Sequence, residues 1–319
     1  MHLNLFIHKL LIVLHNYYQQ TNQKPIKMKT TKKGLLLSAL ALGMLFACNK
    51  NEEKVESTLD QPQGLITSCS YVDGNWSSTA VLSSSFGSTT DTNFMNSQNS
   101  KISAVWGQSL TPLKFVKDPS NPGSTYNAIS YGGSPRKIYF GEAIYKDAKS
   151  KSANNIVNAM ILAHEFGHQL QYNYNLPSKR ENTARPNELE ADAFAGYYLR
   201  KPAGFNSASF ATIAVASDFA FAIGDNQTTS AGHHGTPPQR RSAVRLGFLL
   251  ADPGNGNLTA VNFDSNFFYY YSGVLNGTYR MARPANISPE MNQYISSHMA
   301  ELRRINSGEM SKEEFQQLD

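Results

Sequence analysis

The sequence predicts an α+β fold in which long helices pack on a small, mostly antiparallel sheet. The β-prone segments are short and are separated by turn-forming residues. We expect strands at 113–116, 128–131 and 137–145. Longer segments carry apolar residues at helical spacing, as in 91–106 and 154–170. We expect these strands and helices to build one domain, residues 63–319.

Residues 1–47 are expected to be a targeting segment. Met28 begins a lysine-rich stretch, and an apolar run at 34–47 follows it. This run is too short to span a membrane and has the length of a signal-peptide core. Residues 1–27 carry a second apolar patch that does not fit this pattern, so we expect translation to start at Met28. A genuine N-terminal anchor segment is the alternative.

Cys48 is expected to carry a lipid. The apolar run ends with Leu-Phe-Ala-Cys at 45–48, which resembles the cleavage box of bacterial lipoproteins. Cleavage there would leave Cys48 as an anchor in the bacterial cell envelope, on its periplasmic or its surface-exposed face. An ordinary secretory signal with an incidental cysteine is the alternative. The polar residues 48–62 would form a flexible tether, and Cys69 would have no disulfide partner.

The charge of the chain argues against a nucleic-acid partner. The formal net charge is +5, but 6 of the 29 basic residues and none of the 24 acidic residues lie in residues 1–47. The rest of the chain therefore has 23 basic and 24 acidic residues. This balance lacks the basic excess that nucleic-acid binding requires.

The strongest functional signal is the stretch 163–169, which reads Ala-His-Glu-Phe-Gly-His-Gln. His164 and His168 are four residues apart, so both lie on the same side of a helix and can bind one metal ion. Glu165 lies beside them and can act on a water molecule. Gly167 costs a helix about 1 kcal/mol relative to alanine, and the close approach of another backbone beside the metal is one reason for such a residue.

A third ligand is expected from a second helix at 185–196. Six residues beyond the motif, where a longer signature has its third histidine, the chain has Tyr174. Glu188 and Asp192 share one face of the second helix, whereas Glu190 lies about 200° from Glu188. Ligation by Glu188 leaves one position open, as in catalytic zinc sites, and Asp192 can accept the outer N–H of a ligating histidine. An acidic first turn favoured by the helix dipole is the alternative.

Three blocks of the sequence resemble the bacterial neutral zinc metallopeptidases. They read His-Glu-Phe-Gly-His-Gln-Leu-Gln at 164–171, Glu-Leu-Glu-Ala-Asp-Ala-Phe-Ala-Gly at 188–196 and His-Gly-Thr-Pro-Pro-Gln-Arg-Arg at 234–241. This family belongs to the glutamate-liganded zinc peptidases, so the resemblance implies a zincin-like fold and one Zn²⁺ ion. Members often carry cysteines before the active-site helix and after the second-block aspartate, where this chain has Ala193.

The resemblance also implies roles for residues of the third block. It places His234 near the zinc, where its imidazole would hydrogen-bond the developing oxyanion. A loop cap or a surface position is the alternative for His234. Arg240 or Arg241, on a helix that we expect at 237–250, would pair with Asp192 or Glu190 and hold the two helices together.

Two further segments are candidates for contact with the substrate. In zincin-like folds a strand that borders the cleft pairs with extended substrate, and 137–141 is the strand expected here, because addition to a free edge needs only backbone groups. The aromatic segment 263–271 is expected to pack in the core rather than to form a substrate platform. A helical end is expected at 286–319.

The expected function is that of a zinc-dependent endopeptidase tethered to the bacterial cell envelope. Zinc would bind to His164, His168 and Glu188, with Glu165 as the catalytic base and a protein or peptide as the substrate. Two alternatives remain open. One is a lipoprotein binding module that keeps the fold without catalysis, and the other is a zinc hydrolase of another envelope amide.

Overall fold

The computed structural model describes residues 76–83, 85–222 and 233–319. All described residues belong to one compact unit, Ala47–Asp319. The predicted signal peptide, the lipidated Cys48 and the tether lie outside the described residues. Within the described part, no helix combines the length and the apolar character that a membrane span requires.

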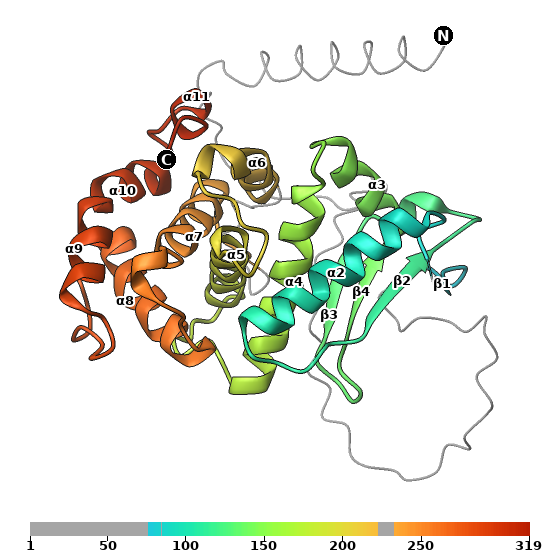
Figure 1. Cartoon of the computed structure of the whole chain (residues 1–319), viewed down its shortest axis with the longest axis horizontal. Coiled ribbons are helices and arrows are strands. Elements are labelled where there is room, and N and C mark those ends of the chain that lie inside the picture. Colours follow the sequence, from blue (N-terminus) through green and yellow to red (C-terminus); the bar gives the residue numbers. More distant parts are fainter. Residues whose placement is uncertain (1–75, 84, 223–232) are drawn as a thin grey trace, which may run out of the picture. The chain divides into compact units, whose positions relative to one another are not determined.

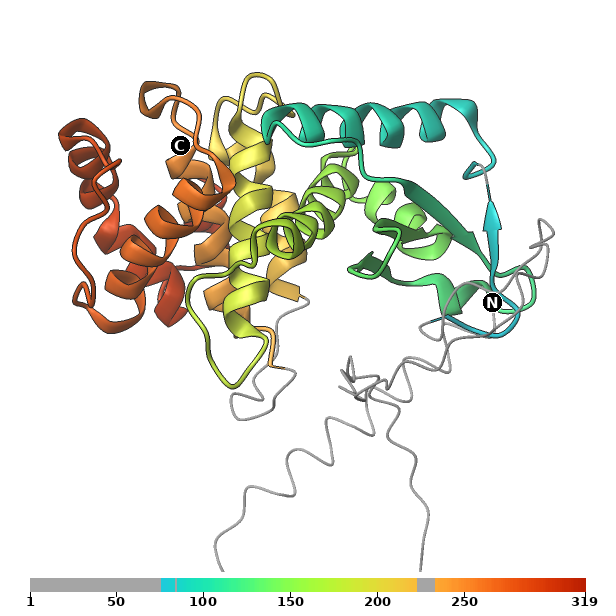
Figure 2. The same cartoon turned by 90° about the horizontal axis from the view of Figure 1, so that it is seen from below.

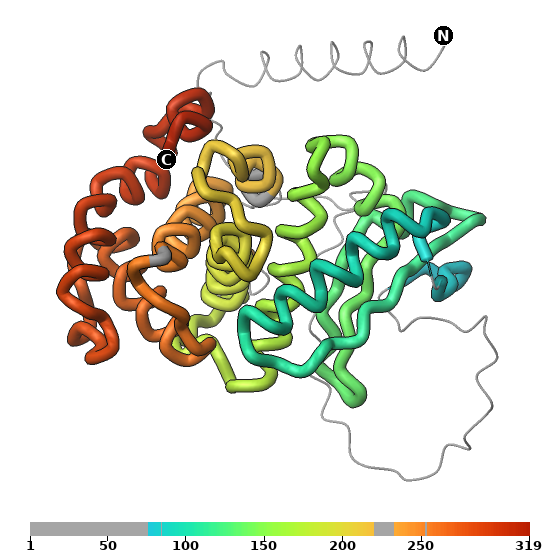
Figure 3. Tube along the Cα trace, in the orientation of Figure 1, coloured from blue at the N-terminus to red at the C-terminus, as the bar shows by residue number. Residues whose placement is uncertain are grey.

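The described chain has an α+β fold, as predicted (Figure 1). Its first part contains β1 (Val81–Ser83), α2 (Thr89–Val105), β2 (Leu113–Lys117), the 3-10 turn η1 (Pro122–Thr125), β3 (Ala128–Tyr131), β4 (Lys137–Gly141) and α3 (Glu142–Ser150). The rest is helical: α4 (Ile156–Tyr174), α5 (Arg185–Arg200), η2 (Phe210–Ile213), α6 (Ala214–Ala222), α7 (Pro237–Leu250), η3 (Pro253–Asn255), α8 (Ala260–Asn276), α9 (Pro289–Ser297), α10 (Met299–Ser307) and α11 (Lys312–Phe315). The tube in Figure 3 follows the same path.

The described strands form one mixed sheet in the order β1-β2-β4-β3. The pairs β1–β2 and β3–β4 are antiparallel, as predicted for most of the sheet, whereas β2 and β4 are parallel. Because β4 lies between β2 and β3, the prediction that 137–141 forms a free edge is wrong. The strand at the edge on that side of the described sheet is β3, which pairs with β4.

The predicted strand at 137–145 is wrong in its second half. β4 ends at Gly141, where a Cβ atom would lie 1.9 Å from the carbonyl oxygen of Thr125, so only glycine fits. Glu142 then begins α3 as an acidic first-turn residue, which the helix dipole favours. Ile144, Tyr145 and Ala148 fall at helical spacing and are buried, and this short helical period is hard to distinguish from a strand.

The two faces of the sheet pack against different cores. Phe115, Ile138 and Phe140 belong to the large core shared with the helices, whereas Val116 and Tyr139 alternate with them and pack in a smaller cluster. The aromatic residues of segment 263–271 lie in α8 and are buried in the large core, as predicted: Phe263, Phe267, Phe268, Tyr269, Tyr270 and Tyr271.

Helix α4 lies between the sheet and the helices that follow it in sequence (Figure 2). It begins after Asn155, whose left-handed backbone (φ 60°) breaks the preceding turn. At Gly167 an added Cβ would lie 3.1 Å from the Cα of Ala191 on α5. The predicted close approach of a second backbone is therefore confirmed, and it brings the two predicted metal-binding helices together.

Helices α5 and α7 cross at two reciprocal glycines. A Cβ on Gly196 would lie 2.2 Å from the carbonyl oxygen of Val244, and a Cβ on Gly247 would lie 2.0 Å from that of Ala193. Neither helix can carry a side chain at this crossing without moving its neighbour's backbone. The crossing fixes the distance between the acidic residues of α5 and the arginines of α7.

We expect Gly247→Ala to lower the free energy of unfolding by about 1–3 kcal/mol, because the new methyl group forces α5 and α7 apart. Thermal and urea unfolding measure this change. Gly123→Ala is the control, since a Cβ there meets nothing closer than 4.0 Å. An unchanged stability of Gly247→Ala would show that the crossing is not tight.

Candidate metal centre

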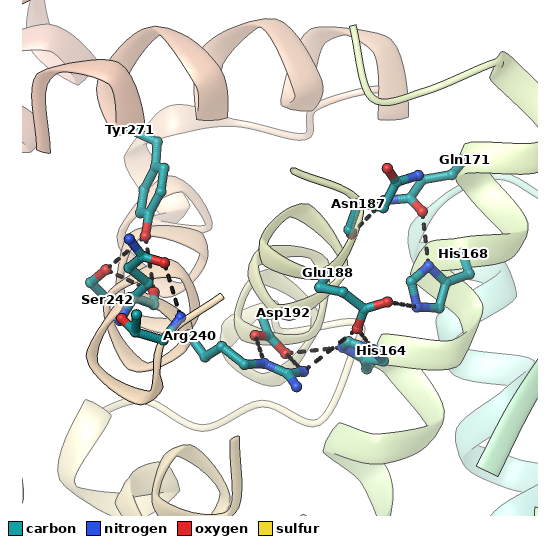
Figure 4. Close-up of polar contacts among 11 residues, drawn as sticks. His164, His168, Gln171, Asn187, Glu188, Asp192, Arg240, Ser242 and Tyr271 are labelled. Carbon is teal, nitrogen blue, oxygen red and sulfur yellow. Dashed lines mark hydrogen bonds and ion pairs between the residues drawn. The ribbon is translucent and has the colours of Figure 1, made fainter. Parts of the chain in front are cut away.

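The structure brings His164, His168 and Glu188 together, as the sequence predicted (Figure 4). The Nε2 atom of His164 lies 3.4 Å from Oε2 of Glu188, and Nε2 of His168 lies 3.6 Å from Oε1 of the same carboxylate. One ligand atom from each residue falls within 4.8 Å of the other two. The histidines come from α4 and the glutamate from α5, so the tight contact at Gly167 sets the size of the site.

These distances fit a tetrahedral zinc ion. Zinc binds histidine nitrogens and carboxylate oxygens at roughly 2.0–2.1 Å, which places neighbouring donor atoms of a tetrahedron about 3.4 Å apart. Each imidazole has one oxygen of Glu188 near that spacing, Oε2 for His164 and Oε1 for His168. Two nitrogens and one oxygen also form the donor set of catalytic zinc sites that keep one position for water.

Asp192 holds the first histidine, as predicted. Its Oδ1 atom lies 2.9 Å from Nδ1 of His164, and Asp192 is 1% exposed. Arg240 on α7 donates to both carboxylate oxygens of Asp192, at 2.6 and 2.8 Å, and is itself buried. Of the pairings expected for the two arginines, Arg240 with Asp192 is confirmed, whereas Arg241 bonds to Asp218 on α6.

Gln171 holds the second histidine, a role that the sequence analysis did not assign. Its Oε1 atom lies 2.8 Å from Nδ1 of His168. Its Nε2 atom donates to the carbonyl oxygen of Asn187 at 2.7 Å and to Oε2 of Glu190 at 2.9 Å. The sequence feature that could have indicated this role is the spacing, because Gln171 is three residues after His168 and hence on the same helical face.

Glu165 is buried beside the two imidazoles, with 8% of its surface exposed. Burial raises the pKa of its carboxyl group above the ordinary value, and the negative charge of Glu188 acts in the same direction. The backbone N–H of Ser130, on the edge strand β3, donates to this carboxyl group and opposes that pKa shift. The predicted base therefore lies between the candidate ligands and the edge of the sheet.

The electrostatic field at the three candidate ligands favours a cation. Burial alone would lower the pKa of His164, but the carboxylates of Asp192 and Glu188 outweigh it and raise this pKa to about 10. Burial likewise opposes ionisation of Glu188, but the two imidazoles and Arg240 hold its pKa well below the ordinary value. A site that stabilises positive charge on an imidazole also stabilises a divalent cation.

Tyr172 is a second residue that the sequence analysis did not assign. It lies one helical turn beyond His168 and is 38% exposed. Its hydroxyl group donates to the carbonyl oxygen of Ser130 at 3.4 Å. Tyr172 thus borders the same segment of β3 that contacts Glu165.

His234 is half-buried in the loop that leads into α7, two residues before the helix cap Thr236. Thr236 and Gln239 form a reciprocal capping box that fixes the start of α7. His234 does not belong to the candidate ligand set. The predicted contact of His234 with an oxyanion stays a prediction.

Comparison of the chain with protein-family models, with curated proteins and with solved structures finds no match.

Proposed function

We propose that this protein is a zinc-dependent endopeptidase with a zincin-like fold, anchored to the bacterial cell envelope through Cys48. The observation that carries the proposal is the convergence of His164, His168 and Glu188 from two helices at distances that fit one zinc ion. The buried Glu165 beside them supports a hydrolytic rather than a structural site, because structural zinc sites have four protein ligands and need no base.

Each side chain of the site has a separate role in the proposed peptide hydrolysis. A zinc ion, when bound, polarises the scissile carbonyl group and makes water a stronger nucleophile. Glu165 accepts the proton of the attacking water and passes it to the leaving amine. Asp192 keeps the Nε2 atom of His164 free for the metal by accepting its Nδ1–H. His234 is the proposed donor to the oxyanion.

The substrate is proposed to be an extended peptide that pairs with β3. In the described sheet β3 has a neighbouring strand, β4, on one side only, and a peptide that pairs with its other edge would compete with the hydrogen bonds that the Ser130 backbone makes to Glu165 and Tyr172. The contacts of Ser130 with Glu165 and Tyr172 place this edge next to the proposed base. Such backbone pairing would also position the scissile bond without demanding a particular side chain.

Metal removal tests the proposal. The purified protein is expected to contain one zinc ion per chain and to cleave peptides, and a chelator is expected to abolish cleavage until zinc is restored. Zinc at about 1,000 times its dissociation constant should add about 4 kcal/mol to the free energy of unfolding. Metal analysis, unfolding curves and a peptide-cleavage assay measure these effects.

The same experiment separates the alternatives. Zinc without cleavage of any peptide, but with cleavage of cell-wall amides, would assign the site to another envelope hydrolase. A stable protein without bound metal and without cleavage would assign the fold to a binding module.

A further inference from the structure

We infer that Gln171 is a positioning residue, which fixes the orientation and the tautomer of His168 and ties it to the segment of α5 that carries Glu188. The inference rests on the proposed zinc site. It concerns a residue that neither binds the metal nor contacts the reacting atoms.

The surroundings of Gln171 settle which way its amide group faces. The carbonyl oxygen of Asn187 can only accept a hydrogen bond, so the atom 2.7 Å from it must be the amide nitrogen. The carboxyl group of Glu190 lies 2.9 Å from the same nitrogen. The amide oxygen therefore faces His168, at 2.8 Å from Nδ1.

This orientation dictates the tautomer of His168. An amide oxygen can only accept, so Nδ1 of His168 must carry a proton, and in the neutral imidazole Nε2 is left with its lone pair. Nε2 is the atom that lies 3.6 Å from Glu188, on the side of the candidate metal. Gln171 thus does for His168 what Asp192 does for His164, with a neutral amide in place of a carboxylate.

Gln171 also links the two ligand-bearing helices. Its side chain is 2% exposed and spans from α4 to α5. The carbonyl group that it contacts belongs to Asn187, the residue immediately before Glu188. A single buried amide therefore couples the position of one ligand to the backbone of another, and its loss should loosen both (Figure 4).

The test compares Gln171→Met with Gln169→Met. Both residues are buried glutamines of α4, but the Gln169 amide nitrogen donates to Ser130, Tyr131 and Lys137 of the β3–β4 hairpin and not to a candidate ligand. We expect Gln171→Met to weaken zinc binding about 10- to 100-fold, and Gln169→Met to leave zinc affinity within about twofold while lowering thermal stability.

Two spectroscopic readouts separate positioning from simple loss of stability. The visible spectrum of the Co²⁺-substituted protein reports the coordination geometry and should change in Gln171→Met but not in Gln169→Met. In the zinc-loaded wild-type protein, ¹⁵N NMR should show Nε2 of His168 on the metal and a slowly exchanging Nδ1–H. The NMR readout does not depend on how well either variant folds.

The outcomes distinguish this inference from the proposed function. A wild-type protein that binds no zinc would overturn both. Zinc binding by the wild type with unchanged affinity and spectrum in Gln171→Met would overturn the positioning role alone. Coordination of zinc through Nδ1 of His168 in the wild type would do the same.

Discussion

Glu165→Gln is expected to lower the rate of peptide cleavage by about 10²- to 10⁴-fold while zinc stays bound. Glutamine has the same size and occupies the same buried position, but its amide cannot accept the proton of the attacking water. The three candidate ligands do not include Glu165, so the affinity for the metal should change little. Measuring kcat together with the zinc content of the purified variant checks both parts.

Glu142→Gln is the matched control for this experiment. It makes the same chemical change at the first turn of α3, where Glu142 forms ion pairs with Lys117 and Lys146 at the surface. Surface ion pairs contribute about 0–1 kcal/mol, so neither cleavage nor zinc binding should change measurably. Full activity of Glu165→Gln would remove the proposed base and leave hydrolysis to another group.

The ligand set could be predicted because its geometry is mostly local. The spacing of His164 and His168 on one helix fixes their relation, and the spacing of Glu188 and Asp192 on another fixes theirs. Only the contact between the two helices had to be inferred, and Gly167 provided the signal because a mid-helix glycine needs a packing reason.

The parts that could not be predicted depend on contacts distant in sequence. Strand order is one of them. Nothing in residues 137–141 indicates that β4 will pair with β2 on one side as well as with β3 on the other. The role of Gln171 is another, because it requires Asn187 and Glu190 at known distances from α4. The choice between Arg240 and Arg241 depends likewise on the rotation of α7, which its crossing with α5 sets.

Asp192→Ala is expected to lower the free energy of unfolding by about 3–5 kcal/mol. Asp192 and Arg240 are 1% and 2% exposed, and the two hydrogen bonds between them join α5 to α7. Removing the carboxylate leaves the guanidinium group buried with its strongest partner gone, and among the described residues the nearest remaining carboxylate oxygen, on Glu188, lies 4.0 Å away. Urea unfolding of the metal-free protein isolates this effect from the loss of zinc.

Arg240→Met shows whether the cost comes from an unpaired charge or from lost packing. If an unpaired charge dominates, the double variant Asp192→Ala with Arg240→Met should be more stable than the sum of the two single losses predicts, because neither charge is then left alone. Strict additivity would contradict this explanation.

Zinc affinity gives an independent measure of the role that Asp192 has at the metal site. It should fall about 10- to 100-fold in Asp192→Ala, which removes the acceptor of the His164 Nδ1–H, and less in Arg240→Met, which retains it.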